Sequence, residues 1–133
     1  MEKPLSNTSF TFSDGIDGRY IIDLYAGDYV MIEETFNDVY REYDEFVNRI
    51  ITTYHEGDLA GLKGAVHKIK PLFGFVGLMA QQAQCLQFEN SCLAMTPAQL
   101  ADAFGPLEKT LLAAKSTIEK ETRRLAEFNA MMS

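Results

Sequence analysis

The sequence DYVMIEETFNDVYREYDEFVNRIITTYHEG, residues 28–57, carries apolar side chains at spacings of three and four residues. These side chains are Ile32, Phe36, Val39, Tyr43, Phe46, Ile50 and Tyr54. At that spacing they share one face of an α-helix, in the manner of a coiled coil. Asp28 is a suitable N-terminal cap for this helix, and Gly57 is a suitable residue to end it. The stretch therefore predicts a long amphipathic helix that needs other helices to cover its apolar face.

The same periodicity continues on both sides of this stretch. A short helix is predicted over residues 17–25, before Gly27. Asp58 can cap a third helix, which stops near Gly77 and has Leu59, Leu62, Val66, Ile69, Phe73 and Val76 in phase. A fourth helix over residues 78–93 is expected to place Leu78, Cys85, Leu86, Cys92 and Leu93 inward. Thr96 and Pro97 form an N-cap and first-turn pair for a last helix. That helix has Leu100, Phe104, Leu107, Leu111, Ala114, Ile118, Leu125 and Phe128 in phase.

These segments predict the fold class and the domain boundaries. No alternation with a period of two and no hairpin signal is found, so we expect an all-α protein. Long amphipathic helices with short connections predict an antiparallel up-down four-helix bundle over residues 17–129, with a short extra N-terminal helix. Residues 1–16 are mostly polar and turn-prone, and we expect a flexible arm there. Gly105 and Pro106 interrupt the last segment without changing its phase, which predicts a kinked helix or two nearly coaxial helices.

Composition excludes several classes of function. The chain has 133 residues, enough for one domain, and its formal net charge is −7. An acidic chain is a poor partner for nucleic acids and for anionic membrane surfaces. The longest uncharged apolar stretch, residues 71–80, is too short to cross a bilayer. The first residues lack the apolar core of a secretory signal. We therefore expect a soluble, cytoplasmic, monomeric protein.

Enzyme and metal motifs are missing from the sequence. There is no glycine-rich phosphate loop, no metal-spaced set of Cys and His, and no nucleophile elbow. Cys85 and Cys92 lie seven residues apart and are interpreted as buried apolar side chains rather than a redox or metal pair. His55 has no companion groups and is interpreted as a surface residue. We expect no cofactor and no bound metal.

One segment reverses the sign of the chain's charge. Residues 59–77, LAGLKGAVHKIKPLFGFVG, contain Lys63, Lys68 and Lys70 and no acidic residue. The segment therefore carries +3, and the rest of the chain carries −10. His67 lies at the centre of this cationic segment.

The helical geometry places His67 on the flank of its helix rather than in the core. His67 follows Val66, so it is about 100° further round the helix. Lys63 and Lys70 are its neighbours on the same face. Its other neighbours on that face, Gly64, Pro71 and Gly74, have small or compact side chains. A neutral imidazole there is a candidate phosphoryl acceptor beside ammonium groups that would offset phosphate charge. From these residues alone, a simple solvated histidine is the favoured interpretation.

This segment resembles the histidine-containing phosphotransfer (HPt) domains of bacterial phosphorelays. Their pattern is His, Lys three residues later and Gly ten residues later, which here are His67, Lys70 and Gly77. Gly27–Asp28 and Gly57–Asp58 match the starts of two of their helices, and Leu86 and Glu89 match a Leu-x-x-Glu in the next. The resemblance covers about residues 17–125 and implies the four-helix bundle already predicted.

The resemblance also implies a function and its residues. His67 would be the phosphoacceptor, Glu89 would orient it, and Lys70 would bind phosphoryl oxygens, with Lys63 and Lys68 adding positive charge. The partner would be a response-regulator receiver domain, a hybrid sensor kinase, or both, and the Mg²⁺ that transfer needs would belong to the receiver. The chain would be a relay intermediate with no ATP site, not an enzyme.

Departures from the family pattern keep other interpretations open. The family usually has Gly and then Ser or Ala after the Lys, where this chain has Pro71, Leu72 and Phe73. Leu72 and Phe75 are expected near the docking surface, with Tyr20, Ile21, Ile22 and Leu24 of the first helix either beside them or capping the core. One alternative is a helical adaptor that binds a receiver without accepting phosphate. A weaker one is a purely structural or dimerisation module.

Overall fold

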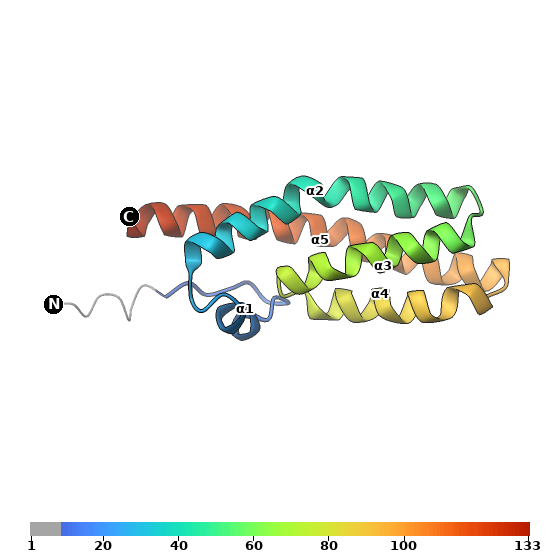
Figure 1. Ribbon diagram of the computed structural model, residues 1–133, viewed down its shortest axis with the longest axis horizontal. Helices are drawn as coiled ribbons and strands as arrows, with labels where there is room; N and C mark the ends of the chain where they lie inside the picture. The colour runs from blue at the N-terminus through green and yellow to red at the C-terminus, as the bar shows by residue number, and fades with distance from the viewer. Residues whose placement is uncertain (1–8) are drawn as a thin grey trace.

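The computed structural model describes residues 9–133, and this part of the chain is helical without a β-strand. The elements in order are α1 (Gly18–Leu24), α2 (Tyr29–His55), α3 (Leu59–Phe75), α4 (Met79–Ser91), the 3₁₀ turn η2 (Cys92–Ala94) and α5 (Pro97–Met132). Figure 1 shows α2, α3, α4 and α5 lying along the long axis of the molecule, with α1 at one end. The prediction of an all-α protein is confirmed.

The predicted helix boundaries are confirmed by their caps. The side chain of Asp28 accepts a hydrogen bond from the Met31 N–H at the start of α2. The side chain of Asp58 accepts one from the Gly61 N–H at the start of α3. At the start of α5, Thr96 and Gln99 exchange side-chain-to-backbone bonds in a capping box. Gly57 has φ +71° in the turn after α2, a left-handed conformation that favours glycine.

The core lies where α2 packs against α3 and α5, and where α4 packs against α3 and α5. Its largest fully buried side chains include Phe36, Tyr43 and Ile50 from α2, Leu62, Ile69 and Phe73 from α3, and Leu107, Leu111 and Ile118 from α5. Burying each of these hydrophobic side chains stabilises the fold by about 1.5–3 kcal/mol. The Tyr43 hydroxyl, buried among them, donates to the Leu111 carbonyl at 2.6 Å, which ties α2 to α5.

The inward face of α4 differs from the prediction. Leu78, Cys85 and Cys92 are buried as expected, but Leu86 is 46% exposed and Leu93 is also exposed. Phe88 is buried in their place. The reason is geometric: Leu86 follows Cys85 by one residue and therefore lies about 100° away from the face that α3 and α5 cover. The exposed Leu86 belongs to the surface of the molecule.

The expectation of a flexible arm over residues 1–16 is wrong for the part that the structure describes. Residues 9–16 lie against the helices: Ile16 is buried, and Phe10 and Phe12 pack on the core. The predicted arm contains two phenylalanines, and their apolar surface outweighs the polar character of its other residues. We call residues 9–16 the strap. Residues 1–8 lie outside the described part of the chain.

The strap is held by a buried glutamate of α5. Glu121 is fully buried and accepts hydrogen bonds from the Ser13 N–H and the Ser13 hydroxyl, both at 2.7 Å. Arg124 forms an ion pair with Glu121 at 2.7 Å and donates to the Thr11 carbonyl at 2.8 Å. The buried carboxylate is thus fully paired, as a charge in the interior requires.

The last helix, α5, contains a glycine and a proline in its interior. Helix α5 continues through Gly105 and Pro106 as one element, so the alternative of two coaxial helices is wrong. The nitrogen of Pro106 carries no hydrogen and cannot donate to the carbonyl of Asp102, four residues earlier. Both residues are exposed, so this carbonyl can bind water instead.

Within residues 9–133, no helix combines the length and the apolar character needed to span a membrane.

Candidate functional site

The candidate site is formed where α3 and α4 pack together. Val66 and Ile69 of α3 are completely buried, and they fix the rotation of the helix. His67, next to Val66, is therefore turned to the flank as predicted, and 65% of its side chain is exposed. Glu89 approaches from α4, and its side chain is only 12% exposed. The sequence placed these two residues 22 positions apart, and the fold brings them into contact.

Glu89 joins the imidazole and a lysine. Its Oε2 lies 2.7 Å from Nδ1 of His67. Its Oε1 lies 2.6 Å from Nζ of Lys70, whose side chain is 18% exposed. One carboxylate thus holds both residues, each by a different oxygen. His67 and Lys70 lie three residues apart on α3, so both reach the same carboxylate.

The electrostatics of Glu89 determine the proton on His67. Burial raises the pKa of Glu89, but hydrogen bonds from Lys70 and His67, together with their charges, outweigh it, and the pKa lies below its ordinary value. The carboxylate is therefore ionised near neutral pH and can only accept hydrogen bonds. Nδ1 of His67 must then carry the proton. In the neutral ring, the lone pair is left on Nε2, the ring nitrogen that does not contact Glu89.

Two supporting contacts were not predicted. Nζ of Lys63 donates to the backbone carbonyl of Glu89 at 3.1 Å, so Lys63 fixes the α4 backbone rather than merely adding charge. Gln82 Nε2 donates to the Lys70 carbonyl at 3.0 Å. Gln82 precedes Glu89 by seven residues, two helical turns, and that spacing is the sequence signal that could have found it. Gly74 leaves room for this amide, since a Cβ there would lie 3.0 Å from Gln82 Nε2.

The surface beside the imidazole is hollow and mixed in character. A depression of about 570 Å³ borders His67 and Lys70, and it is also lined by Pro71, Met79, Gln82, Ala83 and Leu86. Pro71 is exposed within α3 and has no N–H to give to the His67 carbonyl. The depression offers apolar surface next to the exposed ring, which a second protein could cover.

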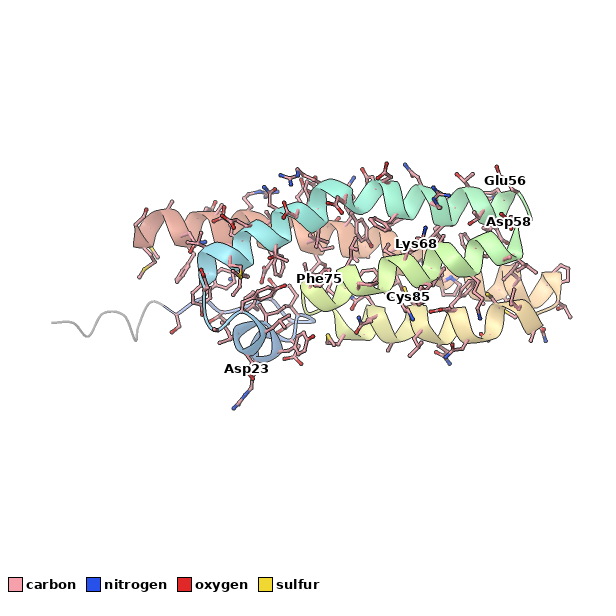
Figure 2. The ribbon with its side chains drawn as sticks, viewed as in Figure 1. Asp23, Glu56, Asp58, Lys68, Phe75 and Cys85 are labelled. Carbon is pink, nitrogen blue, oxygen red and sulfur yellow. The ribbon has the colours of Figure 1, made fainter. Side chains whose placement is uncertain are left out.

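The remaining predicted residues have separate places. Lys68 lies on the side of α3 that faces α2, where it lines a hollow with Phe46 and Arg49 (Figure 2). Gly64 has open space where a side chain would be. Gly77 has φ +71° and accepts a hydrogen bond from the Asp17 N–H, so it supports the strap-to-α1 junction rather than the imidazole.

The predicted docking residues are divided between surface and core. Leu72 is buried, so its expected place on the docking surface is wrong; it follows Pro71 by one residue and turns toward α2. Ile21 is completely buried and caps the core. Phe75, Tyr20 and Leu24 are exposed, while Ile22 is partly buried. Surface apolar groups therefore remain at the α1 end of α3.

Cys85 and His55 take no part in the site, and Cys92 contributes only a thiol hydrogen bond to the Glu89 carbonyl at 3.7 Å. Burial raises the pKa of the Cys85 thiol to about 12, which makes it a poor nucleophile and metal ligand. Cys92 is buried as well, and both thiols are free. His55 is exposed at the end of α2 and contacts the edge of Tyr54. Within residues 9–133 no three His, Cys, Asp or Glu side chains group in a way that could hold a metal ion.

Comparison with known proteins found no protein-family model, curated protein or solved structure that matches the chain. Inferences about function therefore rest on the contacts of His67, Lys70 and Glu89.

Proposed function

We propose that the chain is a histidine phosphotransfer protein of a phosphorelay, in which His67 carries a phosphoryl group between receiver-domain aspartates. In this proposal α2, α3, α4 and α5 form an antiparallel up-down four-helix bundle, with α1 as the short extra helix. The observation that carries the proposal is the contact between Nδ1 of His67 and Oε2 of Glu89 at 2.7 Å. It presents an oriented imidazole at the surface, with the lone pair of Nε2 turned away from the carboxylate.

The transfer step follows from that orientation. The Nε2 lone pair of neutral His67 attacks the phosphorus of an aspartyl phosphate on the receiver. The Nε2–P bond forms as the P–O bond to the aspartate breaks, and the aspartate leaves as a carboxylate. No proton moves, because Nδ1–H remains on the ring and bonded to Glu89. The ring becomes cationic on transfer, and the adjacent carboxylate stabilises that charge. Reverse transfer uses the same contacts.

Lys70 is suited to the phosphoryl oxygens. Its ammonium group is held 2.6 Å from Glu89, on the same face as His67. An ammonium group has three donors, so Lys70 can keep this ion pair and still donate to a phosphoryl oxygen. Lys63 holds the Glu89 backbone and so keeps the carboxylate in place. The Mg²⁺ needed for aspartyl phosphate chemistry would be the receiver's.

The proposal includes the cellular setting expected from the sequence. The chain would act in the cytoplasm as a monomer, with a receiver domain or a hybrid kinase as partner. It would bind neither nucleic acid nor membrane. It would receive phosphate only from another protein, without an ATP site or independent turnover.

The test is phosphate uptake by the intact chain. We expect at least one phosphorylated receiver domain from the same cell to add one acid-labile phosphate, measured by intact mass. His67→Gln removes the acceptor and should abolish this label, whereas His55→Gln changes the other histidine and should keep it. Label on the His67→Gln variant, or none on the wild type with any receiver, would contradict the proposal.

A specific feature favours a second candidate function, a receiver-binding adaptor that accepts no phosphate. Pro71 lies one turn after His67 and leaves the His67 carbonyl without its helical hydrogen bond. If this change disables transfer, a receiver will bind without labelling His67. Replacing Pro71 by Gly would then be expected to restore the label.

A further inference from the structure

Two hollows lie one after the other along the junction of α2 and α3, and we treat them together as one groove. On α2 it is lined at spacings of three and four residues, which keeps its lining on one helical face. On α3 the lining residues likewise lie on one face. The lining residues are Thr35, Asp38, Val39, Glu42, Glu45, Phe46 and Arg49 of α2 and Ala65, Lys68, Leu72 and Phe75 of α3. We call this feature the α2–α3 groove.

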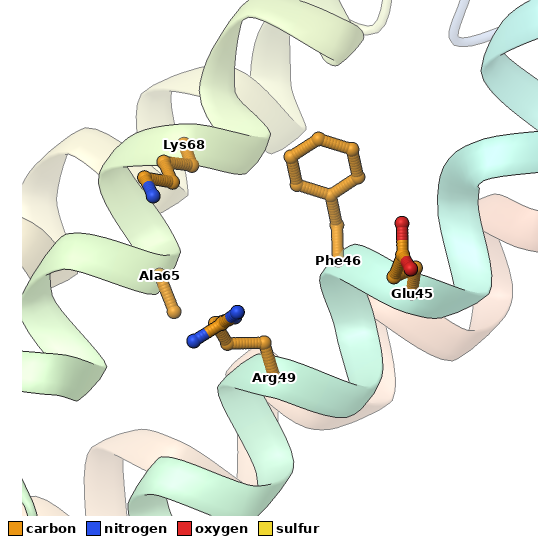
Figure 3. Close-up of a pocket in the computed structure, with 5 residues that line it drawn as sticks. All are labelled: Glu45, Phe46, Arg49, Ala65 and Lys68. Carbon is orange, nitrogen blue, oxygen red and sulfur yellow. The ribbon is translucent and has the colours of Figure 1, made fainter.

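The groove has a cationic end. Arg49 and Lys68 line a hollow of about 260 Å³ there, with Phe46 and Ala65 as its apolar surface. Figure 3 shows Arg49 and Phe46 reaching from α2 toward α3, with Glu45 on the far side of Phe46. Among the described residues, no carboxylate forms an ion pair with Arg49 or Lys68. Two cations without an ion-pair partner among the described residues thus line one small cavity together with Glu45, in a chain whose net charge is −7.

The other end of the groove is apolar and acidic. A hollow of about 350 Å³ is lined there by Leu72, Phe75, Tyr25, Asp38 and Glu42, among others. Phe75 is 47% exposed and lies at the α1 end of α3 (Figure 2). Asp38 is already paired with Arg41. The basic residues that line the groove, Arg49 and Lys68, therefore both lie at one end of it.

We propose that the Arg49–Lys68 end of the groove receives a carboxylate side chain of the receiver domain that docks on His67. This inference rests on the proposed function. A protein that brings an aspartyl phosphate into bonding contact with His67 must also cover its surroundings, because stable interfaces bury about 800 Å² on each partner. Lys68 directly follows His67 in α3, so the cavity that Lys68 lines falls within the area that the docked receiver would cover.

Charge complementarity selects the chemistry of the docked group. An aspartate or glutamate side chain has a carboxylate for the two cations and methylene groups for Phe46 and Ala65. A basic side chain would be repelled at this end. A carboxylate of the partner is unfavourable next to Glu42 at the other end, and this favours one orientation of the partner along the groove, since like charges placed together repel.

The proposed contact at Arg49 and Lys68 would contribute to binding of the receiver rather than to the phosphoryl-transfer step. Arg49 and Lys68 are exposed and take no part in the ion pairs that join His67, Lys70 and Glu89. Charges at the rim of an interface act mainly on the association rate and its salt dependence. Their removal should raise the receiver concentration needed for transfer and leave the step at saturation unchanged.

The experiment measures transfer rates from the receiver that labels the wild type fastest, at increasing receiver concentration. Arg49→Glu is expected to raise KM about tenfold with kcat unchanged, and Arg49→Gln to raise it less. Lys68→Glu should raise KM similarly. Lys109→Glu, the same charge change at an exposed site on α5, is the matched control and should leave KM within about twofold of wild type. Added salt should reduce the difference between wild type and Arg49→Glu.

The outcomes separate this inference from the function on which it rests. Equal KM values for Arg49→Glu and Lys109→Glu, with His67 still labelled, would overturn the groove proposal alone. Failure of the wild type to take phosphate at His67, from receivers or from phosphoramidate, would overturn the proposed function and the groove proposal with it. A wild-type dimer in light scattering that Arg49→Glu dissociates would assign the groove to a second copy of the chain and contradict a receiver carboxylate.

Discussion

Glu89 and Glu121 are both glutamates that pair with a cation on a helix, yet they lie in opposite surroundings. Glu121 is fully buried, and its oxygens are taken by Ser13 and Arg124. The Glu89 side chain lies between α3 and α4 and is 12% exposed, but one of its partners, His67, is 65% exposed. Both oxygens of Glu121 are bonded within the molecule, so this carboxylate has no site left for another partner. The arrangement at Glu89 leaves one ring nitrogen and part of an ammonium group to bind something else.

The difference shows what distinguishes a candidate site from a structural ion pair. A buried pair whose partners are all satisfied can only stabilise or specify the fold. A pair whose partners keep unused donors or lone pairs at the surface can do chemistry. Substitutions at Glu121 should therefore affect the stability of the fold, and substitutions at Glu89 should affect transfer.

The largest effect is expected at Glu121. Replacing it by Ala leaves Arg124 without its charge partner and Ser13 without an acceptor, which should lower the free energy of unfolding by about 3–5 kcal/mol. Glu119→Ala is the matched control: its carboxylate is exposed and 3.8 Å from Arg123, so about 0–1 kcal/mol is expected. Urea unfolding followed by circular dichroism measures both. A loss at Glu121 no larger than at Glu119 would show that the strap contact is not structural.

Substitution of Glu89 is expected to change the free energy of unfolding less than substitution of Glu121 does, but to act directly on phosphoryl transfer. Glu89→Ala removes the acceptor that orients Nδ1 of His67, and transfer should slow about 10- to 100-fold, as for other residues that orient a functional imidazole. Glu89→Gln keeps an acceptor oxygen and should lie between wild type and Glu89→Ala. Rates of label uptake from the fastest receiver measure this series. Wild-type rates for Glu89→Ala would mean that the orientation of the ring does not matter.

The smallest effect is expected on the pH dependence of stability. The pKa of Glu89 lies below its ordinary value of 4.5, since burial raises it but the hydrogen bonds from Lys70 and His67 outweigh burial. A lowered pKa in the folded state means that the ionised group stabilises the fold above about pH 4.5 and loses that contribution as pH falls through the lowered pKa. The stability difference between wild type and Glu89→Gln should therefore shrink as pH falls from about 6 to about 3. A difference that grows on acidification would reverse the sign of this coupling.

Much of this arrangement could be predicted from the sequence because it depends on helical periodicity. The rotation of α3 follows from Leu62, Val66, Ile69 and Phe73, and the position of His67 one residue after Val66 then puts it on the flank. The capping residues Asp28, Asp58 and Thr96 fixed the helix starts for the same reason: their chemistry is local.

The errors fall where tertiary contacts decide. Periodicity could not tell that Leu72 is covered by α2, because this residue lies at the border of an apolar face. The exposure of Leu86 does follow from its place one residue after the buried Cys85, and its predicted inward position was wrong on that ground. Phe10 and Phe12 gave too short a pattern to indicate a packed strap, and its partner Glu121 lies more than 100 residues away. The Lys63 bond to the Glu89 carbonyl involves backbone, which carries no sequence signal.

The most direct measurement is the site of phosphate attachment on the ring. Wild-type protein with ¹⁵N-labelled histidine would be phosphorylated with phosphoramidate, and NMR spectra linking ring protons to nitrogens would identify the substituted atom. Because Glu89 holds Nδ1–H, the phosphate should be found on Nε2 of His67, with the same product in His55→Gln and none at this position in His67→Gln. Phosphate on Nδ1, or none on His67, would contradict an imidazole oriented by Glu89 for phosphoryl transfer.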